Sequence, residues 1–287
     1  MRKAVFATAS LVCAVALAGC GESDTDATAS MFDDPQRLAA AASSETAQSQ
    51  SANFTLEADL PGREITAEGA GSFDGAESAL SMTADMAGRQ MQLRMVDQTV
   101  YMTQPTRDSA NADATSWVQI PLDEAHSSSH QGQLGQNGQI DQLLEQHDPQ
   151  RILESIAQSG SITGSERARL DGESVTHYTI ELDLGEFAQH GPVEMPPEAR
   201  QALPETEPVP LQLWVNDDNL PVKVVVDASS MVQVAADAAG HSVPEGEATI
   251  TMRYTDWGTQ VDVQPPPEDQ IEELHSRPNA PPGDGLG

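Results

Sequence analysis

Cysteine is almost absent from this chain of 287 residues. The two cysteines, Cys13 and Cys20, both lie within the first twenty residues. The chain after residue 20 therefore has no disulfide and no thiolate that could bind a metal or act as a nucleophile. Thiol-based redox chemistry is excluded from that part of the protein.

Positive charge is also scarce. Fourteen lysines and arginines stand against 45 acidic residues, which gives a formal net charge of −31. A charge of this sign repels phosphate backbones and anionic head groups, so nucleic acid is excluded as a partner. The acidic residues are too numerous for any pair to stand out as catalytic, and most of them are expected to form a solvated surface.

Only one long apolar run occurs, from Ala4 to Leu17. It follows Arg2 and Lys3, and it is shorter than the roughly 20 residues that a membrane-spanning helix needs. A basic start, a short apolar run and small residues before a cleavage site are typical of a signal peptide, here residues 1–19. Its removal takes away two positive charges and no acid, which changes the net charge from −31 to −33.

The end of this run, Leu17-Ala18-Gly19-Cys20, resembles the lipobox of bacterial lipoproteins. The resemblance implies that the signal peptidase cuts before Cys20 and that the thiol carries a diacylglyceryl group. Buried acyl chain is worth about 0.8 kcal/mol per CH₂, so two chains hold a protein firmly on a membrane. The protein is then lipid-anchored on the extracytoplasmic face of the cell membrane. The alternative is an ordinary cleaved signal peptide with a chance cysteine.

Composition divides the exported chain into three parts. Residues 20–33 are small and acidic and are expected to form a flexible tether behind the lipidated cysteine. Residues 34–264 are long enough for one domain. Residues 265–287 are rich in proline and acids, which predicts a disordered tail.

Asp34 followed by Pro35 is a helix-start signal, because aspartate caps a helix and proline fits its first turn. Asp148-Pro149 repeats that signal. Between the helices, apolar residues alternate along short runs bounded by turn residues, which is typical of antiparallel strands. Helices are expected over residues 35–50, 140–144, 149–160 and 198–203, and strands over residues 53–60, 64–73, 80–86, 91–95, 99–103, 117–120, 161–170, 174–182, 211–216, 220–227, 231–235, 248–254 and 259–263.

The sequence contains no nucleophile elbow, zinc-protease pair, phosphate loop or dinucleotide fingerprint. His126 and His130 have metal-ligand spacing, but they lie in a polar loop without a third ligand. Asp217-Asp218-Asn219 resembles part of a calcium loop but lacks its glycine and closing glutamate, which favours a turn. We therefore expect no catalytic residue, metal or cofactor. A hydrolase that uses scattered histidines and aspartates is the third-ranked alternative.

Methionine is concentrated in three consecutive expected strands, on their apolar face: Met82, Met86, Met91, Met95 and Met102. Methionine fills irregular gaps in protein cores, so core packing is one interpretation. Tightly packed strands prefer β-branched and aromatic residues, however, and aromatics are only 4% of this chain. The alternative interpretation is a soft apolar cavity for chains of variable shape.

Several short pieces occur in an order that resembles the LppX/LprG-like lipoproteins of actinobacteria, which share the LolA/LolB-like half-barrel. The resemblance implies an α+β fold, with a large curved antiparallel sheet, or half-open β-barrel, and helices packed in its concave side. The pieces are Val100-Tyr101-Met102, the Trp117 strand, Asp148-Pro149 with Ile152-Leu153, Gly172–Tyr178, Leu213–Asn216 with Leu220–Lys223, and Tyr254–Gly258.

The resemblance also implies a non-enzymatic function, in which an apolar cavity binds or transfers lipids or acylated molecules across the cell envelope. Expected partners are the lipid, the membrane and an envelope transport protein, and the protein is expected to be a monomer. The alternative is an anchored interaction or sensor module whose half-barrel is filled by its own side chains. The expected cavity lining is Phe54, Leu56, Leu80, Met82, Met86, Met91, Leu93, Met95, Met102, Trp117, Leu144, Ile152 and Ile156.

Overall fold

The computed structural model describes residues 31–73, 78–86, 88–103, 116–121, 149–186, 208–238, 244 and 246–272. Within these ranges twelve strands form one sheet, in the spatial order β12-β6-β5-β4-β3-β2-β1-β11-β10-β9-β8-β7. The strands are β1 (Ser51–Leu60), β2 (Arg63–Ser72), β3 (Ala79–Met86), β4 (Arg89–Val96), β5 (Thr99–Thr103), β6 (Trp117–Pro121), β7 (Gly160–Leu170), β8 (Glu173–Asp183), β9 (Pro208–Asn216), β10 (Pro221–Asp227), β11 (Thr249–Thr255) and β12 (Ile271–Glu272).

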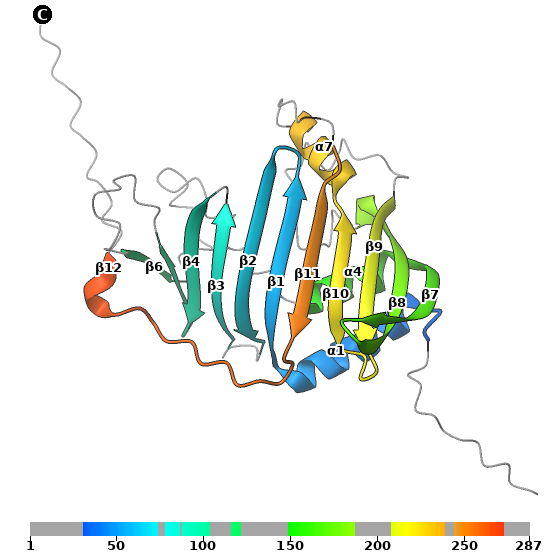
Figure 1. Ribbon diagram of the computed structural model, residues 1–287, viewed down its shortest axis with the longest axis horizontal. Helices are drawn as coiled ribbons and strands as arrows, with labels where there is room; N and C mark the ends of the chain where they lie inside the picture. The colour runs from blue at the N-terminus through cyan, green and yellow to red at the C-terminus, as the bar shows by residue number, and fades with distance from the viewer. Residues whose placement is uncertain are drawn as a thin grey trace, which may run out of the picture.

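Strand pairing brings the first strand, β1, next to the late strand β11 at the middle of the sheet. The strand β1 pairs with β2 on one side and with β11 on the other, both antiparallel. Two successive meanders therefore lie side by side in one sheet (Figure 1). The one parallel pair in the described sheet is β12 with β6, at its edge.

Two helices lie on the apolar side of the sheet, α1 (Pro35–Ser49) and α4 (Pro149–Ser159). They pack against each other and against β7 and β8. Leu38, Leu153 and Ile156 are fully buried in the same hydrophobic core as Leu211 and Leu213 of β9. The expected α+β class, with one large antiparallel sheet and helices on its inner side, is confirmed.

The start of α1 follows the expected signal. The side chain of Asp34 accepts a hydrogen bond of 2.8 Å from the backbone N–H of Arg37, and Pro35 occupies the first turn. Such a cap satisfies a backbone donor that has no partner within the helix.

We predict that Asp34→Ala lowers the free energy of unfolding by about 1 kcal/mol, because the N–H of Arg37 loses its acceptor. Chemical denaturation of the two proteins measures the difference. Asp34→Asn is the matched control, since asparagine also caps helices. This variant should retain most of the wild-type free energy of unfolding. An equal loss in both variants would contradict a capping role.

The strand expected over residues 231–235 is wrong, because these residues belong to helix α7 (Ser229–Ala238). Its first turn is set by local hydrogen bonds that alternation does not reveal. The carboxylate of Asp227 accepts from the N–H of Ser229, and the N–H of Val232 donates to the carbonyl of Ala228. The helix joins the end of β10 to the start of β11.

The strand expected over residues 259–263 is also wrong. This segment is extended but pairs with no strand. The hydroxyl of Ser51 donates to the carbonyl of Thr259, and Val263 is buried. The segment passes along the ends of the strands as far as the short helix η4 (Glu268–Gln270) and β12 (Figure 1). The described structure thus continues through residue 272.

Candidate ligand-binding face

The sheet register determines which predicted lining residues share a face, because directly opposed residues of neighbouring strands point to the same side. Met82 opposes Leu93, and Leu93 opposes Met102. On the other side of β3, Met82 opposes Gly69, which opposes Phe54. We call this side of the sheet the apolar face. With the alternating neighbours of these residues it contains Phe54, Leu56, Leu80, Met82, Met86, Met91, Leu93, Met95 and Met102.

Trp117 is the exception among the predicted strand residues. Its neighbour Val118 opposes Met102, so Trp117 points to the opposite side, which we call the polar face. There its ring lies 4.9 Å from the guanidinium of Arg94. Val118 and Ile120 occupy the apolar face in its place, and both are buried. The alternation Trp-Val-Gln-Ile already contained this signal, since Gln119 shares its face with Trp117.

Helix α4 adds two predicted residues to the apolar side. Ile156 is fully buried, and Ile152 packs against the same core while remaining partly exposed. Leu144 lies outside the described residues, as do Cys20, His126 and His130. The structure therefore brings eleven of the thirteen predicted lining residues to one side of the sheet.

Burial varies along the apolar face. Leu80, Met82 and Leu93 are almost completely buried. Met86, Ile65 and Ile250 are partly exposed, and they belong to one cross-strand row through Ala58. That row lies beside the β1–β2 and β3–β4 turns, where the strands end and where α7 is found (Figure 1). We call these strand ends, together with the two turns, the α7 edge. Met91 and Leu56, in the next row, are also partly exposed.

A close contact shapes the middle of the apolar face. Gly69 lies between Phe54 and Met82, and a Cβ added there would lie 2.7 Å from Cζ of Phe54 and 3.1 Å from Cα of Met82. Glycine therefore provides the space that the Phe54 ring occupies. This contact joins the methionine strands to the centre of the sheet.

The polar face carries a row of aromatic and basic side chains across β8 to β11. The rings of His177 and Trp214 stack at 4.3 Å, and the ammonium of Lys223 lies 4.7 Å from the Trp214 centroid. The pKa of Lys223 is lowered, mainly by burial and to a smaller extent by the positive charge of the neighbouring Arg253. The carboxylate of Asp171, in the β7–β8 turn, lies 3.5 Å from Arg253. Trp214 thus contacts His177 and Lys223, which lie on the two strands that flank β9.

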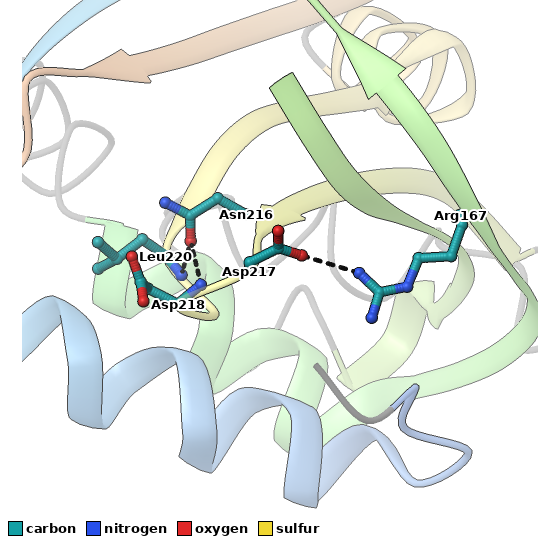
Figure 2. Close-up of polar contacts among 5 residues, drawn as sticks. All are labelled: Arg167, Asn216, Asp217, Asp218 and Leu220. Carbon is teal, nitrogen blue, oxygen red and sulfur yellow. Dashed lines mark hydrogen bonds and ion pairs between the residues drawn. The ribbon is translucent and has the colours of Figure 1, made fainter. Parts of the chain in front are cut away.

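The turn Asp217-Asp218-Asn219 is confirmed as a turn (Figure 2). The side-chain oxygen of Asn216 accepts from the N–H groups of Asp218 and Leu220, at 3.0 and 2.9 Å. The carboxylate of Asp217 points away from this turn and pairs with Arg167 at 2.9 Å. The acidic groups therefore do not converge on a common point. Among the described residues, no group of three or more acidic, histidine or cysteine side chains could hold a metal ion.

No helix in the described part of the chain has the length and apolar character needed to cross a membrane.

Comparison with known proteins finds distant structural likeness. No protein-family model matches the chain, and no curated protein matches its sequence. Among solved structures, the chain resembles LprF from Mycobacterium bovis at 13% identity and a TM-score of 0.48, over 81% of this chain and 96% of LprF. It also resembles MucB at 14% identity and a TM-score of 0.32, over 82% of this chain and 62% of MucB.

A third structure is a DUF1329 family protein from Desulfovibrio piger, with 11% identity, a TM-score of 0.29, and coverage of 78% of this chain and 92% of that protein. LprF belongs to the LppX/LprG-like lipoprotein family. The strand order and packing of this chain give the fold expected from the resemblance to that family, one large open antiparallel sheet with helices packed on its apolar side.

Proposed function

We propose that this protein is a lipid-anchored, extracytoplasmic lipoprotein that binds an acyl chain on the apolar face and carries or presents it within the cell envelope. The observation that supports this proposal is the row of partly exposed apolar side chains at the α7 edge, continuous with a buried methionine-rich interior. Met86, Ile65 and Ile250 belong to that row, and Met82 and Leu93 lie deeper.

Energetics favour a shielded site of this kind. Exposing a sixteen-carbon chain to water costs on the order of 12 kcal/mol, at about 0.8 kcal/mol per CH₂. A carrier must therefore cover most of the chain. Methionine suits such a surface, because its unbranched, polarizable side chain adapts to ligands of different shape. Five methionines, Met82, Met86, Met91, Met95 and Met102, lie on this face within three neighbouring strands.

The expected anchor fits this arrangement. The backbone N–H of Phe32 donates to the hydroxyl of Tyr178 on β8, so the chain joins the sheet next to α1. Phe32 lies twelve residues after Cys20 in the chain. A fully extended chain of that length spans roughly 40 Å. A lipidated Cys20 would hold Phe32, and with it the adjoining end of the domain, within that distance of a membrane.

The test is native mass spectrometry of residues 21–287 purified from a lipid-rich bacterial host. This chain keeps every described helix and strand. We expect bound acyl lipids, and we expect Met91→Arg to abolish them, because the new charge would lie on the apolar face. Gln90→Arg is the matched control, since Gln90 is exposed on the polar face of the same strand. It should retain the lipids.

Because Met91→Arg could also disturb folding, Met91→Trp provides a second variant that remains apolar but fills space. It should fold and bind less lipid. A wild-type chain that is folded, empty and unable to take up a fatty acid would contradict the proposal. That result would favour the alternative, an anchored interaction module whose interior is filled by its own side chains.

A further inference from the structure

Two arginines lie on the apolar face, at the α7 edge. Arg63 opposes Leu60 at the β1–β2 turn, and Arg89 opposes Met86 at the β3–β4 turn. Alternation places Arg63 on the side of Ile65, and it places Arg89 on the side of Met91. Both arginines are exposed. They are therefore the outermost residues of strands whose apolar side chains lead into the core.

Neither guanidinium has a hydrogen-bond or ion-pair partner within the part of the chain that the structure describes. The nearest acids in these hairpins belong to the polar face. Asp59 and Glu64 oppose each other there. Asp85 also points to that side, and its carboxylate accepts from the N–H of Gly88. The two cations thus remain available in a chain whose net charge is −31.

The two arginines are close enough to act on one ligand. Arg63 and Arg89 are separated by β3, and along the strands they are offset by two residues. Strand spacing of about 4.8 Å and a rise of about 3.4 Å per residue place their Cα atoms roughly 12 Å apart. Long, flexible side chains on the same face of the sheet can converge over that distance.

A guanidinium binds carboxylate or phosphate through two parallel N–H donors. We propose that Arg63 and Arg89 bind the anionic head group of an acyl ligand, whose hydrocarbon tail lies along Met86, Ile65 and Met91. The ligand class is therefore an acyl chain with a terminal carboxylate or phosphate, rather than a neutral lipid. This inference rests on the proposed function, because it requires the apolar face to hold the tail.

The experiment compares palmitate with its methyl ester, which has the same tail and no charge. Binding to residues 21–287 is measured by calorimetry at neutral pH. We expect the double variant Arg63→Gln, Arg89→Gln to bind palmitate about tenfold more weakly than the wild type, as follows from losing two exposed charge contacts. Its affinity for the methyl ester should be unchanged, which also shows that the variant is folded.

Two further variants separate specific contact from net charge. Arg63→Lys with Arg89→Lys keeps both charges and should recover part of the palmitate affinity. Arg37→Gln with Arg151→Gln removes the same charge from α1 and α4 and should bind palmitate as the wild type does. Acetate in excess should not displace palmitate, because the head group alone lacks the tail contacts.

Equal wild-type affinity for palmitate and its ester would overturn this inference and leave the proposed function standing. An equal loss in the Arg37, Arg151 variant would also overturn it, since net charge alone would then explain the effect. A wild-type chain that binds neither ligand would contradict both the inference and the proposed function.

Discussion

Replacing Gly69 by alanine is expected to lower the free energy of unfolding by about 2 kcal/mol, within the range measured when extra methyl groups enter a packed core. A Cβ at this position would lie 2.7 Å from Cζ of Phe54 and would also contact the backbone carbonyl of Ser81 on the neighbouring strand. The Phe54 ring can shift only slightly because it is buried. The backbone of β3 cannot yield without disturbing its pairing with β2.

Gly71→Ala is the matched control, two residues along the same strand and on the same face. A Cβ there would lie at 3.1–3.4 Å from side-chain atoms of Phe73 and Leu80. Those side chains can adjust, so the stability should change by a smaller amount. Urea denaturation of the three proteins measures both effects. Equal losses in the two variants would show that loss of glycine, rather than the contacts with Phe54 and the Ser81 carbonyl, governs stability.

Leu93→Ala is expected to cost about 2–5 kcal/mol, because it removes a fully buried side chain and leaves a cavity. Leu93 lies between Met82 and Met102 in the methionine-rich part of the apolar face. Leu213→Ala is the matched control on β9, where the side chain is also fully buried. The two substitutions remove the same atoms from opposite halves of one sheet.

The response to ligand separates the two halves. A ligand that binds only the folded protein raises its stability by an amount that depends on the ratio of its concentration to its dissociation constant. If an acyl chain lies against the methionine strands, its tail can also occupy the space left at Leu93. Thermal unfolding with added palmitate should therefore show a larger stabilisation for Leu93→Ala than for Leu213→Ala. The same shift in both variants would contradict a ligand near Leu93.

Much of the fold could be predicted locally. Alternating apolar residues with turn signals between them predicted eleven of the observed strands, because the side-chain period of two is a property of the backbone itself. The Asp34-Pro35 signal correctly predicted the start of α1. The same alternation assigned the methionines to one face, and the register confirmed that assignment.

The errors occurred where distant parts of the chain or hydrogen bonds determine the structure. Residues 231–235 alternate like a strand, but bonds to Asp227 and Ala228 begin a helix there. Residues 259–263 found no partner strand, and the short strand β12 pairs with β6, more than 140 residues earlier in the chain. A strand of two residues is too short to show an alternation from which such a pairing could be predicted.

The sequence by itself determined the strand pattern, the apolar character of one face and the net charge of −31, because each depends on residue type and local spacing. Only the tertiary structure decided which strands are neighbours. It placed Trp117 beside Arg94 on the polar face, and it gathered Arg63 and Arg89 at the α7 edge beside Met86 and Ile65. The physical reason is that strand order and register depend on packing between residues far apart in the chain, which a local pattern does not encode.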